Sequence, residues 1–279
     1  MHFLLFLFAT LSLVAQETCF FIPPKGWEIA NPEMLSPRVH ICFLGKASQG
    51  APSINLATEP VNVTLDAYVD AVRKIHAGDP NSRWRDLGKY KTLMGEGRLT
   101  ELETPSDAGI SRMVQLIVIK DQIAYILTAS ASKENFSKFY KTFDQTLRTL
   151  QASANLVESY GNSESRNRLK KMIDDVTTKF RAALGFQVNV ADVIQKESND
   201  YYKNFADRKN PRILNKIVEK LDAQLKEASR RDAVKVFQSP EFHDKVWAPF
   251  EQKIINDFTE MGPYWQILIL KEIQTKLIT

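Results

Sequence analysis

Two cysteines, Cys19 and Cys42, are the residues whose chemistry follows most directly from their spacing. They fall on strand-like stretches at residues 18–22 and 38–43. If these stretches form a hairpin centred near residues 30–31, the cysteines lie opposite each other, and an oxidising compartment would allow a cross-strand disulfide. Two buried free thiols are an equally good interpretation, because cysteine packs well as a small hydrophobe.

The remaining residues that could do chemistry are not arranged as a recognisable site. No histidine pair has the i, i+4 spacing of a metal-binding helix, and the Gly-Glu-Gly sequence at residues 95–97 is too short to hold a phosphate. Glu101 and Glu103 lie on one side of a predicted strand, where we expect both to face solvent. We therefore expect no catalytic, cofactor-binding or metal-binding residues, and we favour a protein that is not an enzyme. The four histidines are His2, His40, His76 and His243.

Length and composition indicate a globular protein with room for two ordinary domains. The chain has 279 residues, of which 44% are hydrophobic and 25% are charged. The formal net charge is +4, and the basic residues do not form the concentrated block that is typical of nucleic-acid binding. We therefore expect no nucleic-acid partner.

The N-terminus predicts export from the cell. Residues 3–15 form an apolar core of signal-peptide length, which is too short for a comfortable membrane span. We predict a signal peptide at residues 1–15 with cleavage after Ala15, and hence a secreted or periplasmic protein. A buried N-terminal strand or helix is the alternative. Glu17 and Thr18 precede Cys19 in place of small residues, so a lipid anchor is not expected.

The stretch from residue 111 to residue 150 predicts two strands, a tight turn and a helix. Both strands are apolar on both faces, which is typical of strands inside a sheet that is covered on each side. Further strands are predicted at residues 53–59, 84–92 and 97–104. A helix capped by Thr64 follows the first of them and ends at residues 78–80. The order predicts an α+β domain with a mostly antiparallel sheet and helices packed on it.

A set of short motifs in the first half of the chain carries a family resemblance. The motifs are Ile22-Pro23-Pro24-Lys25-Gly26-Trp27, Val39–Phe43, Pro52-Ser53-Ile54-Asn55-Leu56, Leu65-Asp66-Ala67-Tyr68, Lys120-Asp121-Gln122 with Ala124-Tyr125-Ile126-Leu127-Thr128, and Phe136–Phe143. Together they resemble the Mog/PsbP-like superfamily, in its DcrB-like bacterial periplasmic branch. The resemblance covers about residues 18–151 and implies the fold without catalytic residues.

A calcium or manganese site at Glu101 and Glu103 would have some analogy in this family, but solvated carboxylates are the preferred interpretation. The sequence departs from the family pattern at Gln122, where glycine often follows the Asp, and this leaves the turn type open.

The second half of the chain, which we do not assign to a family, predicts an all-α domain at residues 164–279 after a small, polar linker at residues 152–163. Apolar positions at helical spacing predict helices near residues 169–184, 190–205 and 211–225. Ser239-Pro240 starts another helix, which Pro249 breaks or kinks. The last helix, residues 264–278, is apolar nearly all round, and we favour a core position for it over an exposed docking position.

The sequence favours a secreted or periplasmic non-enzymatic protein that acts through a protein partner or as an accessory factor of the cell envelope. The alternative is a ligand-binding or hydrolytic protein with its site in a cleft between the two domains. In a weaker third interpretation the last helix contacts a membrane surface. We expect no cofactor.

Overall fold

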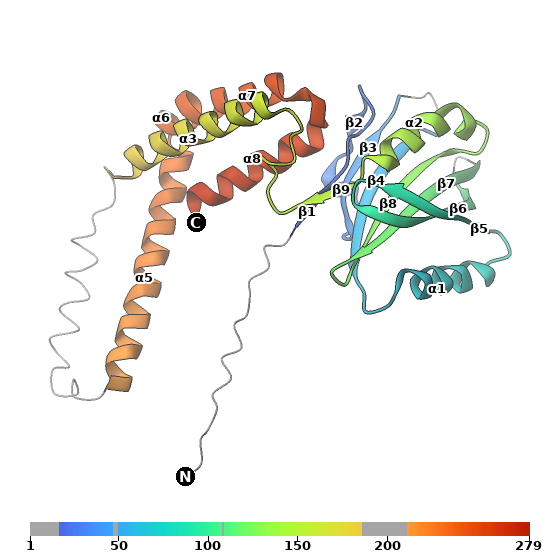
Figure 1. Cartoon of the computed structure of the whole chain (residues 1–279), viewed down its shortest axis with the longest axis horizontal. Helices are drawn as coiled ribbons and strands as arrows, with labels where there is room; N and C mark the ends of the chain where they lie inside the picture. The colour runs from blue at the N-terminus through green and yellow to red at the C-terminus, as the bar shows by residue number, and fades with distance from the viewer. Residues whose placement is uncertain (1–16, 47–49, 108, 186–210) are drawn as a thin grey trace, which may run out of the picture. The chain divides into compact units, whose positions relative to one another are not determined.

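The computed structural model describes residues 17–46, 50–107, 109–185 and 211–279, which form two compact units that divide between Ser159 and Tyr160 (Figure 1). The division falls inside the segment predicted as a linker, residues 152–163. Two predictions lie outside the described residues, namely the signal peptide at residues 1–15 and the helix at residues 190–205.

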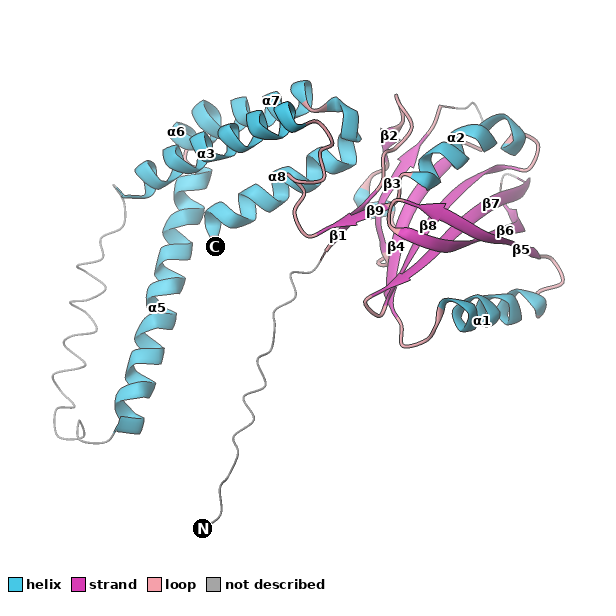
Figure 2. Ribbon diagram, viewed as in Figure 1, coloured by secondary structure: helices cyan, strands magenta, loops and turns pink. Residues whose placement is uncertain are grey.

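The N-terminal unit combines a large sheet with helices (Figure 2). Its helices are α1 (Leu65–Ala77), α2 (Phe136–Arg148) and the short 3₁₀ helix η1 (Pro32–Met34). Its strands are β1 (Thr18–Phe20), β2 (Glu28–Ile29), β3 (Val39–Leu44), β4 (Ser53–Pro60), β5 (Arg83–Thr92), β6 (Gly95–Ser106), β7 (Gly109–Lys120), β8 (Ile123–Ser132) and β9 (Gln151–Ser153).

Among the described residues, seven strands form one antiparallel sheet in the order β2-β3-β4-β8-β7-β6-β5 (Figure 1). Strands β7 and β8 each have a neighbour on both sides. Three consecutive residues of β7, Leu116, Ile117 and Val118, are buried, as expected for a strand that is covered on both faces. The prediction of an apolar hairpin inside the sheet is confirmed, and so is the α+β fold class.

Helices α1 and α2 lie on opposite faces of the sheet (Figure 1). Arg98 on β6 forms an ion pair with Asp66 of α1, at 2.7 Å. Gly97, the preceding residue, pairs in register with Tyr90, whose hydroxyl donates a hydrogen bond to Asp144 of α2. Because successive strand residues point to opposite faces, these contacts place the two helices on opposite sides.

The β7–β8 turn has the left-handed backbone of a tight hairpin without a glycine. Asp121 and Gln122 have φ angles of 50° and 60°, which is the sign that a type I′ turn requires at both central residues. A non-glycine residue in this region costs about 1 kcal/mol. The carbonyl of Gln122 accepts a hydrogen bond from the backbone N–H of Val61, at 2.8 Å, which helps to hold the turn.

The predicted hairpin between the two cysteine-bearing strands is wrong. Strand β1 pairs with β9, where Cys19 faces Ala152, whereas Cys42 on β3 faces Asn55 of β4. Two residues separate β1 from Pro23 and Pro24, and because proline cannot donate to a strand ladder these prolines prevent β1 from continuing toward the turn. The short strand β2 then takes the place beside β3 that the hairpin interpretation gave to β1.

The second unit is helical, as predicted, and it has its own aromatic core. The rings of Tyr160 and Trp265 lie 5.5 Å apart, and those of Phe237 and Trp247 lie 4.8 Å apart. No helix among the described residues is long and apolar enough to cross a membrane. The elements are α3 (Ser163–Gly185), α5 (Pro211–Gln238), α6 (Pro240–Phe242), the π-turn η3 (His243–Trp247), α7 (Ala248–Asp257), the 3₁₀ helix η4 (Thr259–Met261) and α8 (Gly262–Ile278).

Helix α8 belongs to the core of this unit, which confirms the favoured interpretation of the last helix. Apart from Tyr264, its buried residues recur at spacings of three and four and so lie on one broad face, where Trp265 and Ile269 are fully buried. Ile267 lies outside this face and is 42% accessible. The helix therefore packs one face into the bundle, although its composition is apolar nearly all round.

A π-turn directly precedes Pro249, at the point where the sequence predicts a break or kink in the helix. The backbone N–H of Ala248 donates to the carbonyl of His243, five residues earlier, and α7 continues with Pro249 in its first turn. Proline has no N–H to donate, and it is tolerated in a first turn because that N–H has no partner within the helix.

Candidate functional site

An open groove of about 410 Å³ lies between the segment at residues 22–27 and helix α2; we call it the α2 groove. Three residues of α2 and the residue that follows the helix line one side, at helical spacing i, i+3, i+4 and i+7. They carry hydroxyl or amide groups and no charge. The full lining is Ile22, Pro23, Pro24, Lys25, Trp27, Thr142, Gln145, Thr146 and Thr149.

Thr149 joins the two walls of the groove. Its hydroxyl accepts a hydrogen bond from the backbone N–H of Ile22, at 2.8 Å, and donates one to the carbonyl of Thr146, at 2.6 Å. The first of these bonds connects residues that are 127 positions apart in the sequence. The C-terminal end of α2 therefore fixes the start of the opposite wall.

Trp27 is held in place by aromatic and backbone contacts. Its ring meets those of Phe139 and Phe143 edge-on, with centroids 6.4 and 6.3 Å apart. A Cβ atom at Gly45 would lie 2.8 Å from the Trp27 ring, so only glycine permits this approach. The turn before Trp27 uses Gly26, whose φ is 79°.

The groove offers neutral hydrogen-bonding groups, which suit the binding of a ligand or a peptide. Gln145 is exposed and Thr142 is half-buried, so their amide and hydroxyl groups are accessible as donors and acceptors. Lys25 is the single charged residue of the lining. General acid–base and nucleophilic catalysis need paired or activated groups, and the lining contains no such pair.

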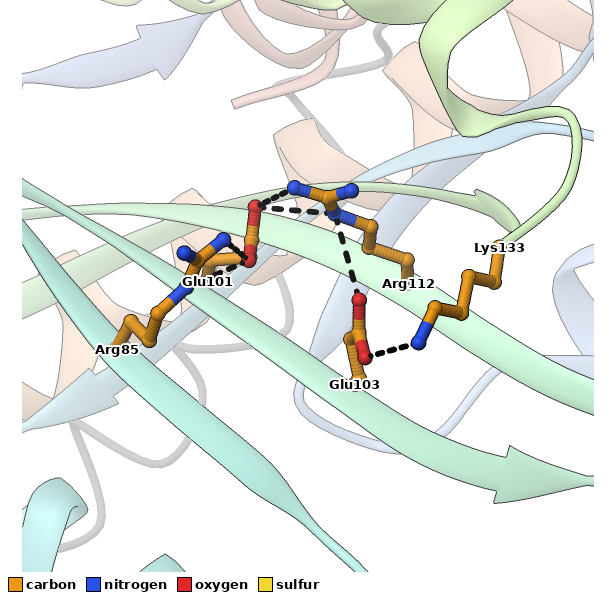
Figure 3. A network of polar contacts seen from close by, with 5 residues as sticks. All are labelled: Arg85, Glu101, Glu103, Arg112 and Lys133. Carbon is orange, nitrogen blue, oxygen red and sulfur yellow. Dashed lines mark hydrogen bonds and ion pairs between the residues drawn. The ribbon is translucent and has the colours of Figure 1, made fainter.

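An ion-pair network around one buried carboxylate lies on the α2 face of the sheet and is drawn in Figure 3; we call it the Glu101 network. Glu101 is 4% exposed. One of its carboxylate oxygens accepts from Nε of Arg85, at 3.0 Å, and the other from Nε of Arg112, at 3.0 Å. Glu103 is bound by Lys133 at 2.8 Å and lies 3.8 Å from Arg112.

This network corrects the prediction that Glu101 and Glu103 face solvent. They do share one side of β6, but that side is covered at the start of α2, where the guanidinium of Arg112 lies 4.9 Å from the Phe136 ring centroid. The hydrogen bond from Lys133 lowers the pKa of Glu103, and the hydrogen bond to Glu101 raises the pKa of Arg85. Arginine and lysine therefore occupy the carboxylate oxygens that a calcium or manganese ion would need.

Two tyrosine–carboxylate–arginine contacts attach the helices to the sheet. Tyr90 donates to Asp144 of α2, at 2.7 Å, and Arg148 binds the same carboxylate while its guanidinium lies 4.9 Å from the Tyr90 ring centroid. Burial raises the pKa of Tyr90, and the Arg148 hydrogen bond lowers the pKa of Asp144. On the other face, Tyr68 of α1 donates in the same way to Glu59.

Cys19 and Cys42 are both buried free thiols. Burial raises the pKa of Cys19 to about 12 and also raises that of Cys42, so neither thiol forms the reactive thiolate readily. A disulfide between them stays a prediction, now without the hairpin that motivated it. Among the described residues no cluster of three histidine, cysteine, aspartate or glutamate side chains could hold a metal ion.

Comparisons with known proteins concern the fold. No family model and no curated protein sequence matches the chain. The solved structure of the cyanobacterial PsbP protein from Synechocystis aligns with 50% of this chain and 94% of its own, at 10% identity and a TM-score of 0.37. PsbP belongs to the family that the N-terminal half of the sequence resembles.

Two further solved structures are similar at the same low level. LpqN, a protein involved in cell envelope biogenesis of Mycobacterium tuberculosis, aligns with 50% of this chain and 84% of its own, at 9% identity and a TM-score of 0.39. A protein of Bacteroides thetaiotaomicron aligns with 78% of this chain and 74% of its own, at 10% identity and a TM-score of 0.32. These values describe a likeness of fold and carry no functional argument.

Sequence reasoning missed both the α2 groove and the burial of the Glu101 network. The groove joins residues 22–27 to residues 142–149, and no local pattern pairs these segments. A signal for the neutral wall was nevertheless present, since Thr142, Gln145, Thr146 and Thr149 form an uncharged stripe beside the apolar stripe of the predicted helix.

Proposed function

We propose that this protein is a secreted or periplasmic binding protein without catalytic activity, whose N-terminal unit holds an extended segment of a partner protein in the α2 groove. The observation that carries the proposal is the groove itself, with its uncharged hydrogen-bonding wall and its wall of proline and tryptophan. The apolar segment at residues 3–15 supports the proposed export. An accessory role at the cell envelope is the proposed setting.

The dimensions of the groove suit a short extended segment. Its helical wall spans positions i to i+7, a rise of about 10 Å, and an extended chain advances about 3.3 Å per residue. About three residues of the partner therefore lie along the wall. Each of them exposes a backbone N–H and a carbonyl, for which Thr142 and Gln145 offer partners.

The charge and shape of the lining define which segment fits. Pro23, Pro24 and Trp27 provide a rigid apolar surface for one side chain of the segment. Lys25 is the charged residue at the groove, so a neutral or acidic segment is favoured over a basic one.

A peptide-display selection on the full-length chain tests the proposal. We expect enriched peptides to be neutral or acidic, and to bind the variant Thr142→Ala/Gln145→Ala at least fivefold more weakly than the wild type, because that variant removes the hydrogen-bonding groups of one wall. Ser137→Ala/Lys141→Ala is the matched control, since it changes two exposed positions of the same helix that lie outside the lining. If no peptide is enriched, or if both variants bind alike, the proposal is wrong.

A further inference from the structure

The helical unit contains a second, smaller hollow of about 120 Å³ between α3 and the chain that runs from η3 into α7; we call it the α3–α7 hollow. Its floor is apolar. Met172 and Val176 contribute from α3, and Phe250 contributes from α7; Val176 and Phe250 are 1% and 6% exposed. The hollow belongs to a different unit from the α2 groove, so the inference below does not depend on the proposed function.

Three lysines surround the apolar floor. Lys179 of α3 forms an ion pair with Asp175, at 2.7 Å. Lys245 and Lys253 approach from the other side, and neither has an ion-pair partner among the described residues. One aspartate therefore faces three exposed ammonium groups, and the rim carries a net positive charge.

The π-turn helps to shape this hollow. Lys245 and Val246 lie within η3, and Pro249 follows in the first turn of α7. A π-turn inserts one residue into a helix and occurs often at functional sites. Here it presents Lys245 on the same side as Lys253, which lies eight residues further along the chain.

We propose that the α3–α7 hollow binds a small amphiphilic carboxylate, with an apolar part of about six carbon atoms on the floor and the carboxylate at the lysine rim. An apolar cavity of roughly 150 Å³ holds one benzene molecule, so 120 Å³ suits an apolar group of that size and excludes a long acyl chain. An inorganic anion would leave the apolar floor uncovered, and an uncharged ring would leave Lys245 and Lys253 unpaired.

Titration of the full-length chain with three probes tests this assignment. Benzoate carries both the ring and the charge, benzyl alcohol has the ring alone, and acetate has the charge alone. We expect benzoate to bind at least tenfold more tightly than either of the others at low ionic strength, and we expect added salt to weaken it. If acetate binds as well as benzoate, the hollow is a non-specific anion site and the proposal fails; equal binding of benzyl alcohol also contradicts it.

Matched variants locate the binding. Lys245→Gln/Lys253→Gln removes the two lysines that lack ion-pair partners, and we expect benzoate to bind at least fivefold more weakly. Lys271→Gln on α8 removes an exposed lysine outside the lining, and we expect a change of less than twofold. All three lysines are exposed, so we expect both variants to fold, which their thermal unfolding verifies. Equal benzoate affinity in the two variants would overturn the assignment.

Discussion

Among the described residues, Glu101 is the charged side chain that lies deepest, and two arginines make this burial possible. Arg85 and Arg112 each bind one of its carboxylate oxygens, while their own side chains remain 61% and 30% exposed. Removing one partner of a buried ion pair leaves the other partner uncompensated, which is costly. Partial exposure of the arginines reduces that cost, because water can solvate them again.

We expect Glu101→Gln to lower the free energy of unfolding by about 1–3 kcal/mol, since two guanidinium groups are left facing a neutral amide. Urea denaturation measures the change. The matched control is Glu96→Gln on the same strand, whose ion pair with Lys89 is exposed to solvent and whose loss should have little effect on stability. Equal losses in the two variants would show that burial of Glu101 is not what matters.

Asp144 makes the stability of the fold depend on pH, and the direction of that dependence follows from its lowered pKa. The Arg148 hydrogen bond lowers its pKa in the folded state, so the carboxylate stabilises the fold above the unfolded-state pKa of about 4, and this contribution is lost as the pH falls through the folded-state value. We expect Asp144→Asn to cost about 1 kcal/mol at pH 7 and progressively less below about pH 4. Urea unfolding across this pH range measures it.

The control for Asp144 is Asp174→Asn on α3, which removes an exposed carboxylate with no ion-pair partner among the described residues. It should leave stability unchanged at every pH. If the free energies of unfolding of wild type and Asp144→Asn differ by the same amount from pH 7 to pH 3, the assigned role of the ionised carboxylate is wrong.

The elements that could be predicted from the sequence are those whose pattern is local, within one helix or one hairpin. The β7–β8 hairpin follows from two continuous apolar runs on either side of a short polar turn, α2 follows from apolar residues at helical spacing, and α8 follows from its apolar composition. The pairing of β1 with β9 could not be predicted, because it joins residue 18 to residue 153 through three residue pairs. Glu101 was misplaced for a similar reason, since its burial depends on Arg85 and Arg112 from neighbouring strands and on α2.

Gln266, a buried residue of α8, caps the C-terminal end of α7. It is 7% exposed, and its side-chain amide donates to the carbonyls of Ile254, Ile255 and Phe258, at 3.3, 3.0 and 3.0 Å. The last carbonyls of a helix have no partner within the helix, and a buried carbonyl without a partner is costly. One side chain of α8 thus supplies the C-terminal cap of α7.

We expect Gln266→Met, which keeps the volume of the side chain but removes its donors, to lower the free energy of unfolding by about 1–3 kcal/mol. Thermal and urea unfolding measure the loss. Gln274→Met, two turns further along α8 on a half-exposed position, is the control and should have little effect. If Gln266→Met is as stable as that control, the carbonyls of α7 do not depend on this cap.

At the scale of the whole molecule, the chain consists of two units that each have their own core. Tyr160 belongs to the helical core, although the sequence places it in a linker. It is 2% exposed, and its ring lies 5.5 Å from the rings of both Phe258 and Trp265. The helical unit therefore begins before residue 164, the boundary that the sequence predicts.

We expect Tyr160→Ala in the full chain to destabilise the helical unit by about 3 kcal/mol or more, because a large buried ring is removed. Tyr140→Ala, which truncates a tyrosine that is 47% exposed, should cost clearly less. The unfolding transitions in urea measure both losses. A negligible loss for Tyr160→Ala would mean that residue 160 is part of a linker after all.

The central claim is that the α2 groove holds a segment of a partner protein, and site-specific cross-linking in the native host tests it most directly. A photo-crosslinking amino acid replaces Gln145 inside the groove or Ser137, an exposed position two turns earlier on the same helix. We predict one discrete cross-linked partner from position 145, which a groove-binding peptide displaces, and none from position 137. Cross-links that are the same from both positions, or absent from position 145, would contradict the claim.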